Sequence, residues 1–279
     1  RVLASWDFDT RALALSEPIK EEWDDKVKKL HYLNREKTLQ GLVAEFGEIG
    51  VDQKIQNFTD LGPKPFSVIA FHNRFFDQVR YAYVMSAFYP ALTGACALGE
   101  RILNHLILAL REDYKASPEY KHVYRKDSFD DWTLAINTLV AWDVLLPNPA
   151  SNFQSLMRMR HEALHFRPET DHADGPLALG AIKCLQEIIG EQFPGYGPQP
   201  WFITDIPGEV YIKKDWETHP FIRKVYLPGS HFVGPRNRVE TVTPVLKIVD
   251  SDDYEKAVEI TDDEFVRMRV EFNGNGQRE

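Results

Sequence analysis

The residues best suited to chemistry are concentrated between positions 151 and 167. This stretch contains several cationic and acidic side chains, namely Arg158, Arg160, His161, Glu162, His165 and Arg167. Its apolar residues Phe153, Leu156, Met157 and Leu164 recur at helical spacing, which predicts one amphipathic helix over 151–167. Arg160 falls on the same buried stripe, and a buried guanidinium is costly unless it is paired. The position of Arg160 therefore calls for a partner.

The expected helix also has sequence signals at both ends. Ser151 with Gln154 three residues later forms a capping-box pattern, so Ser151 is the expected N-cap. Pro168 prevents the helix from running far beyond Arg167. These signals place the ionisable residues in the second half of the helix.

One interpretation of this helix is a zinc site. Residues 161–165 spell His-Glu-Ala-Leu-His, and two histidines four apart on a helix lie about 40° apart around its axis. Both could bind one ion, with Glu162 as general base on a zinc-bound water. The expected third ligand is Glu187, with His172 and Asp171 as weaker choices.

Other residues of the same segment argue against the zinc interpretation. The pattern should arise by chance in on the order of one chain in a hundred of this length. However, Arg160 precedes the first histidine and Arg167 follows the second, and neighbouring cations raise the cost of binding a divalent ion.

A second interpretation pairs Arg160 with His165, four residues intervening. By composition this spacing occurs roughly once per chain of this length, and Arg167 with His172 matches it too, so its weight depends on the surrounding fold. On an ideal helix the Arg160 and His165 side chains point about 140° apart. They could contact the same substrate group only through the length of the arginine side chain or in a site shared with a second copy of the chain.

The rest of the chain predicts a mainly α protein. Helices are expected over 17–34, 35–46, 67–88, 91–113, from 128, over 151–167 and over 176–193, with a loop at 50–66 and a polar loop at 114–127. After a Pro- and Gly-rich boundary at 194–200, short strands are expected at 201–203, 210–212, 221–227 and 245–249, followed by a helix over 262–271. We therefore expect three parts: an N-terminal helical extension (1–66), a helical bundle (67–193) and a small mixed α/β appendage (194–279).

Composition limits the class of protein. The chain has 279 residues, 43% apolar residues and a net charge of −9, which fits a folded protein and argues against one that coats DNA non-specifically. Its two cysteines form no disulfide framework, no apolar run reaches the roughly 20 residues of a membrane span, and no signal-peptide pattern is present. These features predict a cytoplasmic protein without a membrane anchor.

The 91–113 helix offers a partner for Arg160. Glu100 sits beside its buried stripe, one turn from Cys96 and from Leu103, and could orient the guanidinium. The alternative is a carboxylate at the solvent edge of the helix.

Residues 160–166, Arg-His-Glu-Ala-Leu-His-Phe, resemble the Arg-(polar)-x-x-x-His motif of the HEPN family (higher eukaryotes and prokaryotes nucleotide-binding domains). The segment Leu98–Asn104 resembles an earlier helix of that fold, and the resemblance covers about 67–193. It implies a HEPN-like helical bundle that forms homodimers and, in active members, cleaves RNA without a metal. Family members usually carry asparagine after the arginine, where this chain has His161, and many are not catalytic.

The resemblance implies a set of catalytic roles. His165 would move protons as the RNA 2′-hydroxyl attacks the adjacent phosphate, and Arg160 would stabilise the charge that develops on the phosphate oxygens. Glu100 would orient Arg160, and His161 is a further member of the expected site. The leading hypothesis is therefore an endoribonuclease without a cofactor, acting as a toxin or defence effector with a possible protein regulator or antitoxin.

Two other hypotheses remain open at this point. One is a HEPN-like homodimer without catalysis, which binds a partner or ligand through the aromatic band at 71–88 and the C-terminal appendage. The other is the zinc hydrolase built on His161, His165 and Glu187.

Overall fold

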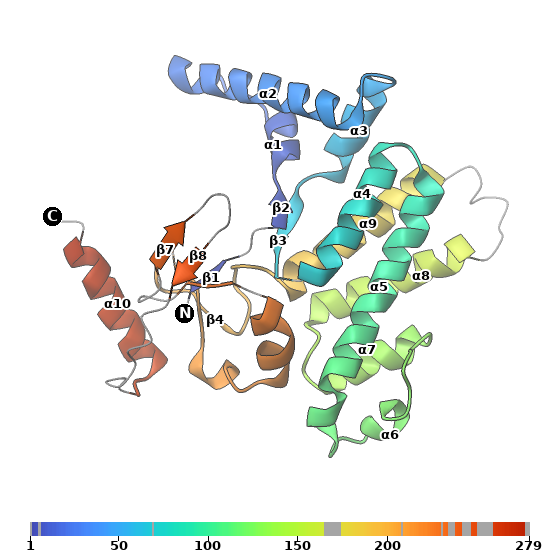
Figure 1. Cartoon of the computed structure of the whole chain (residues 1–279), viewed down its shortest axis with the longest axis vertical. Coiled ribbons are helices and arrows are strands. Elements are labelled where there is room, and N and C mark those ends of the chain that lie inside the picture. The colour runs from blue at the N-terminus through green and yellow to red at the C-terminus, as the bar shows by residue number, and fades with distance from the viewer. Residues whose placement is uncertain are drawn as a thin grey trace.

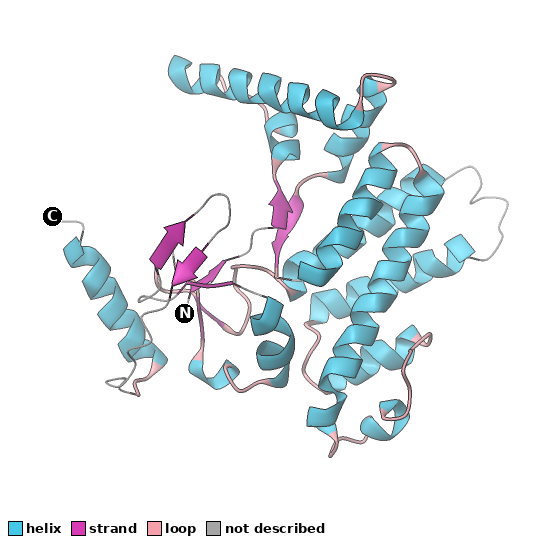
Figure 2. Ribbon diagram, viewed as in Figure 1, coloured by secondary structure: helices cyan, strands magenta, loops and turns pink. Residues whose placement is uncertain are grey.

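The structure is a computed structural model of the whole chain, and it describes residues 2–4, 7–68, 70–164, 174–207, 209–229, 231–233, 238–241, 247–249 and 259–276. It is mainly helical, with small two-stranded sheets beside the helices (Figures 1 and 2). The expected fold class, mainly α with a small α/β appendage, is confirmed. No helix in these ranges combines the length and apolarity that a membrane crossing requires.

Helix α5 (Phe88–Leu110) is the centre of the bundle. It packs against α4 (Ala70–Val84), α7 (Trp132–Ala141), α8 (Pro147–Leu164) and α9 (Asp174–Gln192) (Figure 1). Its buried stripe contains the apolar residues that the sequence placed inward: Cys96, Gly99, Leu103, Leu106, Ile107 and Leu110. The 3.6-residue periodicity of this segment therefore identified the central element correctly.

Close approach of α5 to its neighbours depends on Gly99. A Cβ added there would lie 2.6 Å from Leu156 Cδ2 on α8 and 2.9 Å from the Trp132 ring on α7. Any side chain at this position would require the Leu156 and Trp132 side chains to move.

Several helix ends differ from the expected ones. Helix α8 begins at Pro147, not after Ser151, because its prolines fall in the first turn, where a missing N–H costs little. Helix α7 begins at Trp132 and not at 128, and its cap is Asp131, whose carboxylate accepts from the Leu134 N–H. The break between α4 and α5 lies at Ser86, which has φ 58°, rather than at Pro90.

The N-terminal part holds more regular structure than expected. Residues 50–66 contain α3 (Val51–Leu61) and β3 (Lys64–Ser67) rather than a plain loop. Glycines with positive φ bound α3, Gly50 at 66° and Gly62 at 69°, and its Phe58 and Leu61 side chains are buried. The tight glycine turns, and not a long loop, explain the Gly-Pro signal in this stretch.

The expected division into two helices, at 17–34 and 35–46, is wrong, although residues 25–46 are helical. A short α1 (Arg11–Ser16) is followed by a single helix α2 (Asp25–Phe46), which Asp24 caps by accepting from the Lys26 N–H. Only its second half is buried, through Thr38, Leu42 and Phe46. The first half of α2 extends beyond the bundle, as Figure 1 shows.

The polar segment 114–127 is also partly helical. It includes the end of a 3-10 turn, η1 (Arg111–Tyr114), and a single turn α6 (Tyr120–Val123). Val123 is buried beneath these turns. Its packing against the bundle stabilises them.

The C-terminal part contains the expected strands except one. Strand β4 (Phe202–Ile203) pairs with β5 (Tyr211–Ile212), and β7 (Arg238–Thr241) pairs with β8 (Lys247–Val249). The expected strand at 221–227 is instead a π-helical turn η4 (Ile222–Tyr226), continued by η5 (Leu227–Gly229) and preceded by a 3-10 turn η3 (Lys214–Trp216). The helical turns bring Phe221 and Tyr226 onto the Trp201 ring, which an extended strand would place on opposite faces.

The last helix, α10 (Asp262–Gly276), begins with a capping box. Thr261 Oγ1 accepts from the Glu264 N–H at 3.2 Å, and the Glu264 carboxylate accepts from the Thr261 N–H at 3.1 Å.

Strand pairing connects the two ends of the chain. Strand β1 (Val2–Ala4) is antiparallel to β6 (His231–Val233), with Val2 opposite Val233. Strand β2 (Asp7–Asp9) pairs with β3, which leads into the bundle. The N-terminal segment therefore takes part in the C-terminal appendage as well as in the N-terminal extension.

Candidate functional site

Arg160 and Glu100 meet on one side of the bundle. Arg160 Nη2 lies 3.0 Å from Glu100 Oε2, and both side chains are 30% exposed. The pairing expected between α8 and α5 is therefore present. Arg160 is half-buried, so the desolvation cost that its sequence position implied is met by a carboxylate while water or a ligand can still reach it.

Trp132 completes this cluster from a third helix. Its indole N–H donates to the same Glu100 oxygen at 3.1 Å, and the Arg160 guanidinium lies 5.7 Å from the centre of its ring. Two donors converge on Glu100, and an aromatic surface supports the cation, so the guanidinium is held in one orientation. We call Arg160, Glu100 and Trp132 the arginine cluster.

The sequence did not reveal the role of Trp132. Its contact with Arg160 depends on how α7, α5 and α8 are aligned, and the absence of a side chain at Gly99 allows that alignment.

Much of the guanidinium is available for a ligand. One terminal nitrogen of Arg160 engages Glu100, and its other N–H groups form no hydrogen bond to the described part of the chain. An arginine has five N–H donors arranged to match phosphate or carboxylate oxygens. The cluster could therefore bind an anion without releasing Glu100.

The neighbouring thiols are not reactive groups. Burial raises the pKa of Cys96, one turn from Glu100 on α5, to about 12, although Arg160 acts in the opposite direction. Burial also raises the pKa of Cys184 on α9 to about 11, and its thiol donates to the Asn152 carbonyl oxygen. Both remain protonated at neutral pH, as expected of small buried side chains.

The structure locates only some of the expected catalytic residues. His161 is exposed next to Arg160 on α8, Glu162 is half-buried, and Glu187 is exposed on α9. His165, Asp171 and His172 lie outside the described residues. Within the described ranges no three metal-ligating side chains come together, and the zinc arrangement and the Arg160–His165 arrangement both depend on a residue that these ranges omit.

A histidine pair in the bundle was not anticipated from the sequence. The rings of His72 on α4 and His105 on α5 lie 5.1 Å apart. Burial, with smaller effects from His105 and Arg101, lowers the pKa of His72 to about 3, and burial also lowers the pKa of His105. Both rings are neutral at pH 7, so this pair is suited to packing rather than to proton transfer at that pH.

Comparison of the chain with protein-family models, with curated proteins and with solved structures gives no significant match. The arguments about function therefore rest on the arginine cluster itself and on the motif in the sequence.

Proposed function

We propose that this protein is a HEPN-like, metal-independent endoribonuclease. The observation that supports it is the half-exposed Arg160, fixed by Glu100 and Trp132 but with N–H groups left to donate. Arg160 lies on α8 and is the first residue of the motif, and His165 follows five positions later in the sequence. An arginine held in this way can stabilise the phosphate oxygens of a transition state without reorganising first.

In the proposed reaction the RNA 2′-hydroxyl attacks the adjacent phosphorus and the 5′-oxygen leaves. His165 transfers the protons, Arg160 stabilises the charge on the phosphate oxygens, and Glu100 keeps Arg160 in place. His161, which follows Arg160 in the sequence and is exposed, is assigned a contact with the same RNA backbone. The products carry a 2′,3′-cyclic phosphate and a 5′-hydroxyl.

A biological role follows from this activity. A cytoplasmic ribonuclease of this kind would act as a growth-inhibiting toxin or a defence effector, controlled by a protein regulator or antitoxin. A homodimer that brings two motifs together would also overcome the angle of about 140° between Arg160 and His165 on one ideal helix.

The test is RNA cleavage by the wild type and by His165→Ala and Arg160→Ala, each with and without EDTA. We expect chelator-resistant cleavage, reduced at least about 100-fold in both variants. Arg158→Ala is a matched control, because Arg158 is an exposed arginine on the same helix that bonds to Ser155. Substrates with 2′-deoxynucleotides should be resistant. Cleavage that persists in His165→Ala would refute the proposal, and cleavage that EDTA abolishes, with zinc in the purified protein, would favour the zinc motif.

A second candidate is a HEPN-like dimer that binds a partner without catalysis. Within the aromatic band at 71–88, Phe76 and Tyr83 are buried, but Phe75 and Tyr81 are 40% and 49% exposed on α4. Exposed aromatic side chains are enriched at protein interfaces. This candidate predicts a stable dimer by light scattering that Phe75→Ser weakens, together with no RNA cleavage.

A further inference from the structure

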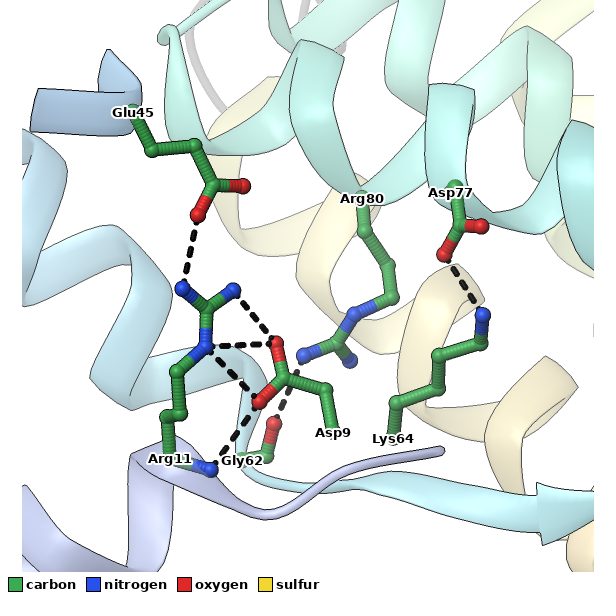
Figure 3. A network of polar contacts seen from close by, with 7 residues as sticks. All are labelled: Asp9, Arg11, Glu45, Gly62, Lys64, Asp77 and Arg80. Carbon is green, nitrogen blue, oxygen red and sulfur yellow. Dashed lines mark hydrogen bonds and ion pairs between the residues drawn. The ribbon is translucent and has the colours of Figure 1, made fainter. Parts of the chain in front are cut away.

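A cavity of about 410 Å³ lies away from the arginine cluster, between the N-terminal segment and helices α2, α3 and α4. Its apolar wall includes Phe46, Phe58 and Tyr81, whose rings form a connected group. Its polar wall includes Asp9, Arg11, Glu45, Asp77 and Arg80, all of which are drawn in Figure 3. A cavity of this size with one apolar and one polar side is typical of small-molecule sites.

Arg80 is the buried cation of this cavity. The residue is only 6% exposed, and two of its N–H groups donate to the Gly62 carbonyl oxygen and to Gln186 Oε1. Both acceptors are neutral, and the remaining three of its five N–H groups form no hydrogen bond to the described part of the chain. Burial lowers the pKa of Arg80 to about 10, so its neighbours offset the cost of burying the charge only in part.

The nearby carboxylates are already engaged with other cations. Asp9 accepts from Arg11, with its Oδ2 at 2.8 Å from Nη2, and Asp77 Oδ1 accepts from Lys64 Nζ at 2.6 Å (Figure 3). Glu45 Oε2 accepts from Arg11 Nη1 at 2.7 Å. Among the described residues, therefore, no carboxylate pairs directly with Arg80.

The charges around the cavity are balanced. Arg11 and Arg80 line the cavity together with Asp9, Glu45 and Asp77. Lys64, which pairs with Asp77 from outside the lining, makes three cations to three anions. A ligand with a net charge would leave one side chain uncompensated in a partly desolvated site. A ligand that carries one positive and one negative group can pair with both signs and keep the balance.

We propose that this cavity binds a free α-amino acid with a bulky apolar side chain. The ligand carboxylate pairs with the N–H groups of Arg80 that are left over. Its ammonium group pairs with Asp77, whose side chain is 58% exposed and retains an oxygen for a further donor. Its side chain packs on Phe46, Phe58 and Tyr81.

Occupancy would have a structural consequence. The cavity is built from the segment around Asp9 and Arg11, the end of α2, and α4 of the bundle. A ligand that contacts all of these elements stabilises their arrangement, so it should raise the melting temperature of the protein.

The experiment is isothermal titration calorimetry, with thermal unfolding in parallel, on the full chain. The probes are L-phenylalanine, glycine, N-acetyl-L-phenylalanine and L-phenylalaninamide. We expect phenylalanine to bind and to raise the melting temperature. The other three should bind at least about tenfold more weakly, because each lacks the side chain, the ammonium charge or the carboxylate.

Variants then test the assigned contacts. Arg80→Lys keeps the charge but loses the planar set of donors, and Asp77→Asn removes an acceptor of the ammonium group; each should weaken binding at least about tenfold. Because Arg80 is buried and Asp77 pairs with Lys64, folding of both variants is checked by circular dichroism. Tyr81→Ala, at a 49% exposed position of the apolar wall, tests the contact with the ligand side chain if either fails to fold.

Glu112→Gln is the matched control. Glu112 forms an exposed ion pair with Lys115 at 2.8 Å on another part of the surface, so this variant should bind like the wild type. The proposal is overturned if no probe binds at up to about 10 mM. It is equally overturned if the acetylated or amidated derivative binds as well as phenylalanine, or if folded cavity variants bind normally.

Discussion

Arg160 of α8 and Glu100 of α5 form an ion pair at 3.0 Å while 30% of each side chain stays exposed. An ion pair this exposed contributes only about 0–1 kcal/mol to folding, because solvent screens it. Its geometry nevertheless fixes the direction of the guanidinium. The pair is therefore suited to orienting a functional group more than to stabilising the bundle.

Glu100→Gln tests this difference. We expect RNA cleavage to fall about tenfold, because Arg160 loses its charged anchor but remains present, while unfolding free energy changes by less than about 1 kcal/mol. The measurement is initial cleavage rate together with urea unfolding. Glu112→Gln, which removes a carboxylate from an exposed pair elsewhere, should change neither. If Glu100→Gln destabilises the protein strongly and leaves its cleavage rate unchanged, the pair stabilises the fold and does not orient a catalytic group.

The parts of the structure that the sequence predicted are those with strong local periodicity. The stripe of α5 and the pairing of Glu100 with Arg160 followed from helical spacing, because both depend on which face a residue occupies. The capping box of α10 was equally local, since Thr261 and Glu264 are three residues apart.

The parts that the sequence did not predict depend on contacts between distant segments. Residues 221–227 are apolar enough for a strand, but Trp201 and Phe193 stabilise helical turns there. Trp132 joins the arginine cluster only through the alignment of α7 with α5 and α8. The cavity at Arg80 gathers residues from Asp9 to Val84, which no single motif contains. Tertiary packing determined each of these features.

Gly99→Ala should destabilise the bundle. The added Cβ would lie 2.6 Å from Leu156 and 2.9 Å from Trp132, and overpacking of this kind typically costs about 1–3 kcal/mol. It should also lower RNA cleavage, because Trp132 supports Arg160. Chemical unfolding of the variant gives the first result directly.

Gly41→Ala is the control for that substitution. Gly41 lies inside α2 and has no atom within 4 Å of an added Cβ, so alanine there should stabilise the helix by about 0.5–1 kcal/mol. Equal effects of the two substitutions would contradict the close approach of α5 to α7 and α8.

His72 should make stability fall at acid pH. Its folded pKa of about 3 lies below the ordinary value of 6.5, so the unfolded state binds its proton first as pH falls. The stability associated with the neutral ring is complete above about pH 6.5 and declines as pH falls towards 3, by at most about 1.4 kcal/mol per pH unit.

Urea unfolding between pH 3 and 7 measures this dependence. His72→Gln cannot take up the proton, so its stability should depend less on pH in this range than that of the wild type. His122→Gln, at an exposed position on α6, should leave the slope unchanged. An unaltered slope in His72→Gln would show that the buried ring is not responsible.

Glu209 should hold α10 on the C-terminal part of the chain. Its carboxylate accepts from Arg269 Nε at 2.6 Å, from Arg269 Nη2 at 2.8 Å and from Asn273 Nδ2 at 3.1 Å, and the Tyr211 hydroxyl also donates to it. The Arg269 hydrogen bond, with the others, lowers the pKa of Glu209 to about 2. This contribution is present above the ordinary pKa of 4.5 and is lost as pH falls through 2.

Glu209→Gln removes the charge that both residues of α10 share. We expect faster amide hydrogen exchange and faster proteolysis within Asp262–Gly276, with no change in exchange of α5, because the bundle does not depend on this contact. Glu259→Gln is a close control, since Glu259 precedes α10 and pairs with Lys214 while 82% exposed. Exposed pairs of that kind contribute little to stability, so only the Glu209 variant should release α10. If α10 is equally protected from exchange in both variants, the packing of Phe265 on Tyr211 holds the helix instead.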